Sequence, residues 1–281
     1  MKQGPRSRPS ATPSSPSPAA GFPDRDTSPL RAWFGQFEAV FARYVTLSFR
    51  NPTTLLVSAL QPLLYLFLFG PLLTGVTSLT ADGRRTAYDI YVPALVLQLA
   101  LFGGAFTGLT LLTEFRQGVL ERMMATPIPR SALLAGRILR DTSLLVAQSV
   151  ILICCSLVLG VRFAIGDVLT VLGMVALVAV TLSALSYYVA LRTYNENSLS
   201  TVFNVALLPV LLLSGTMLPM TLAPEWLFWL SRADPLSYVV DGARAAFVGG
   251  HGWEVATAFG VVGTLACLTF LLAVRALSRR A

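Results

Sequence analysis

The chain has 281 residues, of which 54% are hydrophobic and 12% are charged, and its mean hydropathy is +0.68. This apolar share excludes a soluble globular domain and indicates an integral membrane protein with one membrane domain. The net charge of +7 does not indicate nucleic-acid binding, because the basic residues are scattered at the ends of apolar segments and do not gather on one face.

Residues 1–27 consist mainly of Pro, Ser and Ala with interspersed basic residues. Such a composition buries too little apolar surface to offset the entropy of ordering, so we predict a disordered cytoplasmic tail. No apolar core follows its charges, which argues against a cleaved secretory signal. The transmembrane domain is therefore expected over residues 28–281.

A helix is predicted over residues 28–51. Ser28 and Pro29 are typical of a helix start, and Asn51 and Pro52 are typical of its end. Apolar and aromatic residues recur between them at helical spacing, with charged residues on the other faces. The pattern predicts an amphipathic helix that lies in the membrane interface as an anchor.

Six apolar segments are long enough to cross a bilayer, which needs about 20 residues per helix. We expect these transmembrane helices near residues 53–73, 90–112, 133–159, 168–191, 199–218 and 253–274. The first contains Pro62, which neighbouring helices can accommodate. The second carries small residues that predict a face for close helix packing: Gly103, Gly104, Ala105 and Gly108.

Charged residues stand near the start of the third span, at Arg137, Arg140 and Asp141. They could form an ion-paired gate. We favour the simpler interpretation, in which the long arginine side chains extend to the membrane interface.

The stretch EFRQGVLERMMATPIPR, residues 114–130, separates the second and third spans and is rich in charge. Its apolar residues share one face at helical spacing: Phe115, Val119, Leu120, Met123 and Met124. Pro127 and Pro129 then end the pattern, since proline lacks the amide donor. We predict a short amphipathic helix on the cytoplasmic membrane surface, followed by a stiff turn.

The segment between the last two spans breaks into apolar pieces that are too short to cross a bilayer. Pro235 cannot lie inside a continuous helix without a kink, and Asp234 can cap a helix that begins there. We predict two half-helices that dip into the membrane from its outer face.

Six spans place both termini on the same side of the membrane. That side carries all 21 Lys and Arg residues except Arg84, Arg85, Arg162, Arg232 and Arg244. Because basic residues accumulate on the cytoplasmic side, we expect a multi-pass protein of the cell membrane with both termini in the cytoplasm.

Two motifs resemble those of a known family. In and just after the 114–130 stretch, nine residues match in order and spacing: Glu114, Gly118, Leu120, Glu121, Arg122, Pro127, Arg130, Leu134 and Gly136. The second motif is LPMTLAPEWLFWLSRADPLSYVVDGAR, residues 218–244. Together they resemble the type 2 ABC exporter permeases, the daunorubicin-resistance-like family of drug and polysaccharide export permeases. The resemblance covers the chain from about residue 28 onward.

This resemblance implies partners and sites. It implies a cytoplasmic coupling helix that docks on a separate ABC ATPase subunit and involves Glu114, Arg116, Gly118, Glu121, Arg122, Pro127 and Arg130. It implies an outer re-entrant segment before the last span that includes Pro224, Trp226, Asp234, Pro235, Tyr238, Asp241 and Arg244. It further implies a homodimer with two ATPase subunits, and it gives the 28–51 helix an alternative role beside the ATPase at the cytoplasmic entrance.

Residue usage limits the chemistry of this chain. Lys2 is the only lysine, so no phosphate-binding loop ending in GK[ST] exists and we expect no ATP hydrolysis by the chain itself. Cys154, Cys155 and Cys267 lie in apolar runs, so neither a disulfide, a metal site nor a cofactor is expected. His251, the only histidine, falls at a predicted outer boundary, which argues against an intramembrane Ser/His hydrolase.

The leading hypothesis is a permease that exports a hydrophobic small molecule, an antibiotic, drug or lipid-like compound, with energy from a partner ATPase. Apolar, aromatic spans without a large outer domain favour such a substrate over the alternative, a polysaccharide or lipid-linked glycan. An ion-gradient-driven transporter is less favoured, because the middle of the spans offers Gln98 and Gln148 but no carboxylate.

Overall fold

The computed structural model describes residue 60 and residues 63–64, 66–68, 87–118, 129–159, 164–216, 223–247 and 252–278. These parts of the chain are helical and contain no strand, which confirms the predicted all-α class. The helices are α3 (Ala87–Ala105), α4 (Thr107–Arg116), α6 (Arg130–Val158), α7 (Ile165–Thr193), α8 (Glu196–Leu213), α9 (Glu225–Ser231), α10 (Pro235–Phe247) and α11 (Trp253–Ser278).

Five stretches are long and apolar enough to cross a membrane: Tyr91–Arg116, Ser131–Val158, Ile165–Thr193, Glu196–Leu213 and Trp253–Ser278. They correspond to the second through sixth predicted spans. The first predicted span and the predicted interfacial helix at 28–51 lie outside the described residues, apart from a few helical positions between 60 and 68. The second span is longer than predicted and is divided into α3 and α4 at Phe106.

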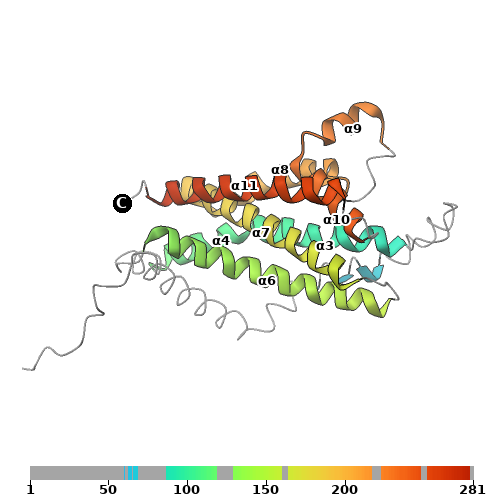
Figure 1. Ribbon diagram of the computed structural model, residues 1–281. Coiled ribbons are helices and arrows are strands. Elements are labelled where there is room, and N and C mark those ends of the chain that lie inside the picture. Colours follow the sequence, from blue (N-terminus) through green and yellow to red (C-terminus); the bar gives the residue numbers. More distant parts are fainter. Residues whose placement is uncertain are drawn as a thin grey trace, which may run out of the picture.

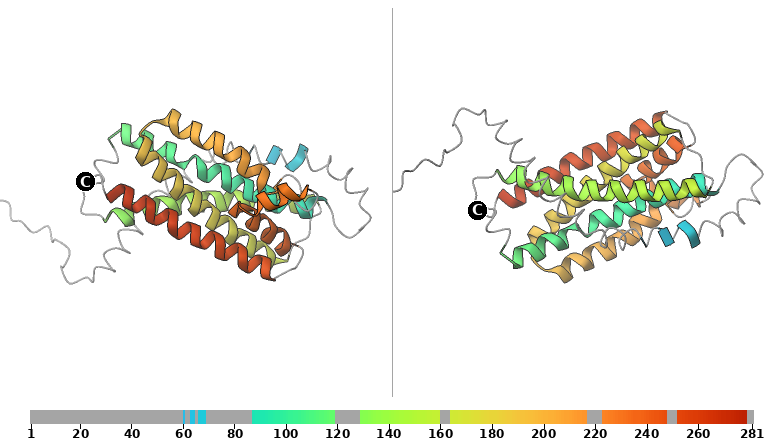
Figure 2. Two further views of the ribbon diagram at one scale, coloured as in Figure 1. Left: turned by 90° about the horizontal axis from the view of Figure 1, so that it is seen from above. Right: turned by 90° about the horizontal axis from the view of Figure 1, so that it is seen from below.

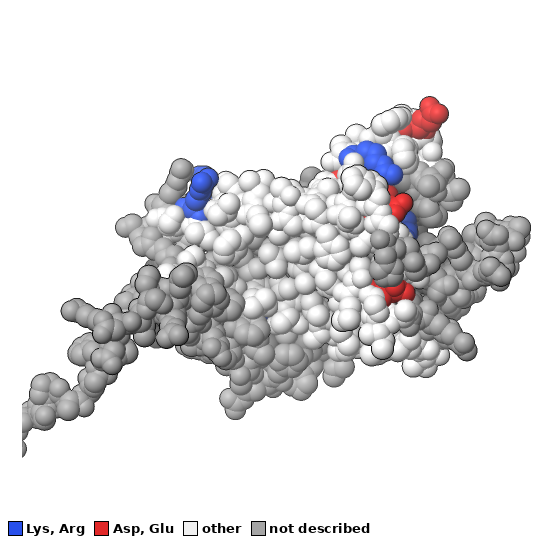
Figure 3. All heavy atoms as spheres, viewed as in Figure 1, with Lys and Arg blue, Asp and Glu red and all other residues white. Residues whose placement is uncertain are grey.

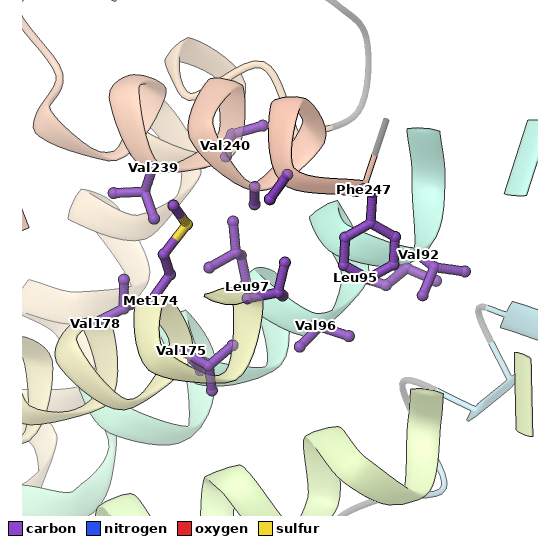
Figure 4. Close-up of a cluster of buried hydrophobic side chains, with 14 of the residues drawn as sticks. Val92, Leu95, Val96, Leu97, Met174, Val175, Val178, Val239, Val240 and Phe247 are labelled. Atoms are coloured by element: carbon purple, nitrogen blue, oxygen red, sulfur yellow. The ribbon is translucent and has the colours of Figure 1, made fainter. Parts of the chain in front are cut away.

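The long helices run side by side as one bundle (Figures 1 and 2), with α7 packed against α3, α4, α6, α8, α10 and α11. Two buried apolar clusters fill the bundle. One joins α3, α6, α7, α10 and α11, and Figure 4 shows part of it around Val96, Met174 and Val240. The other joins α3, α4, α6, α7, α8 and α11 around Leu134, Tyr187 and Leu199.

The bundle has two ends that carry different elements. At one, which we call the Glu114 end, α4, α7 and α11 finish while α6 and α8 begin. At the other, the α9 end, α9 and α10 lie beside the start of α11 (Figure 1). On the face in Figure 3 the charged side chains lie at these two ends, separated by an uncharged band. This distribution is the one expected of helices that cross a bilayer.

The small residues of the second span form a packing face, as predicted. A Cβ added to Gly104 would lie 2.9 Å from Leu182 Cβ on α7, and one added to Gly103 would lie 2.2 Å from a methyl carbon of Leu145 on α6. Glycine therefore permits α3 to approach both neighbours closely.

Two short helices precede α11, and the break between them falls at the predicted place. α9 ends at Ser231 and α10 begins at Pro235, where the Leu236 N–H donates to Asp234 Oδ1 at 3.0 Å. This carboxylate cap confirms the role predicted for Asp234. α10 then packs closely on α11 through Gly242, whose added Cβ would lie 2.7 Å from Ala258 Cβ.

Candidate functional site

A buried ion pair joins α4 to α6 at the Glu114 end. The Glu114 carboxylate pairs with the Arg137 guanidinium, whose side chain is 4% exposed. The preferred interpretation from the sequence, an arginine reaching out to the membrane interface, is therefore wrong for Arg137. A carboxylate on the neighbouring helix lets the charge stay inside the bundle, because burial of a charge is tolerable when it is paired.

A second set of hydrogen-bonded polar side chains joins α6 to α7. Arg140 Nη1 donates to Asp141 Oδ1 at 2.9 Å, and the Tyr187 hydroxyl donates to Asp141 Oδ2. Asp141 is buried, and it lies eleven residues into α6, about 17 Å along the helix axis. The sequence pattern places Asp141 only near the start of the span and does not point to Tyr187, because nothing in a single apolar segment indicates which helix will supply a partner.

The last turn of α4 is held by three different neighbours. Besides the Glu114 pair with α6, Phe115 packs edge-on against Tyr194 in the α7–α8 turn, with ring centroids 5.0 Å apart. Arg116 Nη1 lies 3.4 Å from Glu196 Oε1 at the start of α8. This last pair is more exposed and contributes about 0 to 1 kcal/mol. Consecutive residues thus tie the end of α4 to three elements just before the loop begins.

The boundary between span and loop differs from the prediction. Glu114, Phe115 and Arg116 complete α4, whereas the sequence pattern placed them in a separate loop helix. Gly118 follows in the left-handed region with φ of 68°, and its N–H donates to Phe115 O at 3.0 Å. Because L-residues rarely adopt this conformation, glycine at this position ends the helix.

The other residues predicted for coupling are placed only in part. Glu121, Arg122 and Pro127 lie outside the described residues. Arg130 is the first residue of α6, which begins directly after Pro129.

At the α9 end, Arg232 connects α9 to α10. Its Nη1 donates to Asp241 Oδ2 at 3.1 Å, and its guanidinium lies 5.0 Å from the Phe228 ring centre and 5.3 Å from that of Tyr238. The Tyr238 hydroxyl donates a hydrogen bond to the Arg232 carbonyl at 3.2 Å. Arg232 was missing from the predicted site, although it is the one basic residue between the two apolar pieces.

Arg244 extends this arrangement to the end of α8. Its Nη2 donates to Gly215 O at 2.7 Å and to Thr216 O at 3.4 Å. The structure thus brings Asp234, Pro235, Tyr238, Asp241 and Arg244 of the predicted outer segment into one region. Of the remaining two, Pro224 directly precedes α9, and Trp226 is 68% exposed and has no part in these bonds.

Burial raises the pKa of Asp234 to about 6, against the opposing effect of the bond from the Leu236 N–H. The folded protein thus binds this proton more tightly than an unfolded chain, in which the pKa is about 3.8. The stabilisation that protonation provides is complete below the unfolded value and is lost as the pH rises through about 6.

We expect Asp234→Asn to raise the melting temperature near pH 8 and to remove this part of the pH dependence. Asparagine keeps the oxygen that accepts from Leu236 but carries no charge. Thermal melting of the detergent-purified protein between about pH 4.5 and pH 8 measures the effect. Asp241→Asn is the control, because Asp241 is half-exposed and paired with Arg232. If the melting temperature of Asp234→Asn depends on pH as that of the wild type does, Asp234 is not the source of this pH dependence.

The chain is similar to known transport permeases. The model of the ABC-2 type transporter family matches residues 35–248. The chain is 28% identical over 229 residues to the daunorubicin resistance ABC transporter permease protein DrrB1 of Streptomyces coeruleorubidus, covering 79% of this chain and 80% of that protein. It is also 28% identical over 212 residues to the putative transport permease ycf38 of Pyropia yezoensis, covering 74% of this chain and 72% of that protein.

A third relative is the probable doxorubicin resistance ABC transporter permease protein DrrC of Mycobacterium tuberculosis. The chain is 24% identical to it over 210 residues, which cover 74% of this chain and 75% of that protein. Since the family model spans most of the sequence, the chain belongs to the ABC-2 type transporter family. The resemblance drawn from the 114–130 and 218–244 motifs is thereby confirmed.

Proposed function

We propose that this chain is the membrane permease subunit of an ATP-driven exporter and that a separate ABC ATPase subunit hydrolyses the ATP. The observation that carries the proposal is the family match across residues 35–248, which includes both sequence motifs. The substrate class we propose is a hydrophobic drug-like or lipid-like molecule, taken from the cytoplasm or the inner leaflet. The drug-resistance permeases among the relatives support this class.

The geometry of the Glu114 end suggests how force enters the bundle. We propose that the ATPase docks on the 114–130 stretch through Glu121, Arg122 and their neighbours. The end of α4 is tied to α6, to the α7–α8 turn and to α8, so a displacement of the loop must be transmitted to these elements. Buried ion pairs suit this task, because leaving one partner unpaired is costly and the contacts therefore move as a unit.

A second copy of this chain is the expected partner within the membrane, with two ATPase subunits in the complete exporter. α8 offers a surface on which such a neighbour could pack in the bilayer. Its outward face is apolar and exposed, with Val205 at 69% and Leu208 at 63%. We place the substrate path at or beside the contact between the two copies.

The orientation proposed from the sequence also fits the charges of the described residues. Near the ends of their helices, the Glu114 end carries Arg116, Arg130, Arg192 and Arg275, whereas the α9 end carries Arg232 and Arg244. Since basic residues are retained on the cytoplasmic side, we place the Glu114 end and both termini in the cytoplasm. The half-helices α9 and α10 then enter the membrane from the outer face.

Cysteine labelling tests this orientation. After replacement of the three native cysteines, a single cysteine at the exposed Glu225 should react with an impermeant reagent added outside intact cells, and one at the exposed Asn197 should react only after the cells are opened. Labelling of Asn197 from outside would reverse the topology.

Reconstitution tests the function itself. Vesicles that contain this chain and its co-purifying ATPase should move a hydrophobic fluorescent drug only when ATP is present, and the chain alone should bind no ATP. Transport that proceeds without ATP and stops when a proton gradient is collapsed would identify an ion-driven transporter. Transport of a lipid-linked glycan but of no drug would favour the alternative substrate class.

A further inference from the structure

The second span is broken in its middle, between α3 and α4. Phe106 separates the two helices with φ of −97° and ψ of 2°, and the Leu109 N–H bonds to Phe106 O, three residues back, at 3.1 Å. No proline lies at this position. A break inside a membrane helix releases backbone groups that water cannot satisfy, so other parts of the protein must bind them.

Ser186 of α7 binds backbone groups on both sides of the break. The Gly108 N–H at the start of α4 donates to Ser186 Oγ at 2.9 Å, and the Ser186 hydroxyl donates to Ala105 O at the end of α3 at 2.5 Å. The Thr107 hydroxyl satisfies Gly104 O at 2.8 Å. One fully buried hydroxyl of a neighbouring helix thus replaces the hydrogen bonds that a continuous helix would make.

The close approach of α4 to α7 depends on Gly108. A Cβ at this position would lie 2.7 Å from both Ser186 O and Ser186 Oγ, a distance at which something must shift. The contact between α4 and α7 therefore needs both the glycine and the serine. Glycine allows the α7 backbone to come close, and serine supplies a hydroxyl that can donate and accept at once.

We infer that Ser186 is a positioning residue that holds the hinge between α3 and α4, and that α4 is the lever between this hinge and the ATPase-coupling loop. This inference rests on the proposed function, because it assumes that a partner acts on the loop. The lever is fastened at both ends, at Gly108 by Ser186 and in its last turn by Arg137, Tyr194 and Glu196. Displacement of the loop then turns α4 about Phe106 and reaches α7 through the Ser186 hydroxyl.

The hinge itself is tested on the permease alone, by hydrogen–deuterium exchange in lipid nanodiscs. Ser186→Ala should speed exchange of the amides at the start of α4 by about tenfold, since it removes a buried bond to the Gly108 N–H. Ser183→Ala is the matched control, one turn away on the same helix. Its hydroxyl is equally buried, and no partner for it is found among the described residues. Equal exchange in the two variants would overturn the hinge.

The positioning role is tested with the ATPase present. Ser186→Ala and Gly108→Ala, which disturb the same contact from its two sides, should each lower the amount of drug exported per ATP hydrolysed about fivefold while the complex still assembles. Ser183→Ala should match the wild type. Faster exchange with an unchanged export ratio would overturn the lever. Absence of ATP-driven export in the wild type would instead contradict the proposed function, and the exchange experiment would still decide the hinge.

Discussion

Replacing Arg137 with methionine should lower the free energy of unfolding by about 3 kcal/mol, because it leaves the Glu114 carboxylate beside an apolar side chain. We place the loss at the low end of the range for broken buried pairs, since the Glu114 side chain is 25% exposed. Unfolding of the detergent-purified protein by increasing SDS measures the change. Combining the substitution with Glu114→Gln should restore part of the stability, since the unpaired charge is then removed.

The control for this pair is the second contact of the same helix turn. Arg116→Met breaks the more exposed pair with Glu196 and should cost no more than about 1 kcal/mol. If Arg137→Met is equally mild, or if Glu114→Gln makes it worse, the Glu114 pair does not hold α4 to α6 as we describe.

Reversing the charge of Glu121 should abolish export while the permease stays folded in the membrane. A carboxylate at a protein interface accepts charge-assisted hydrogen bonds, and loss of a buried one costs about 1 to 3 kcal/mol, to which lysine adds repulsion. Glu121→Lys should therefore weaken co-purification of the ATPase, and Glu121→Gln should be milder. Membrane abundance, co-purification and drug efflux are measured together.

Gln117→Lys separates this docking role from a general effect of charge on the loop. Gln117 is exposed at the end of α4, only four residues away. If Glu121 only keeps the loop solvated, the two lysine variants should do equal harm or none. Normal efflux and normal co-purification with Glu121→Lys would remove the docking role from this residue.

Several features of this protein could be predicted because they depend on local sequence. Apolar length defines a membrane-spanning helix whatever it packs against, so the five described spans agree with the predicted ones. Pro235 and Asp234 set the break before α10 through a missing amide and a capping carboxylate, both of which act within a few residues. The family motifs were likewise visible as order and spacing.

What the tertiary structure alone decided is which polar group meets which. Glu114 forms an ion pair with Arg137, and Asp141 accepts a hydrogen bond from Tyr187. Ser186 binds backbone groups on both sides of the break at Phe106. Each of these contacts joins different helices. Sequence patterns even suggested the wrong environment for Arg137, because an arginine near the end of a span can either reach water or pair inside. In an interior without water an unpaired donor or acceptor is costly, and only the packing of the helices determines which partner lies within reach.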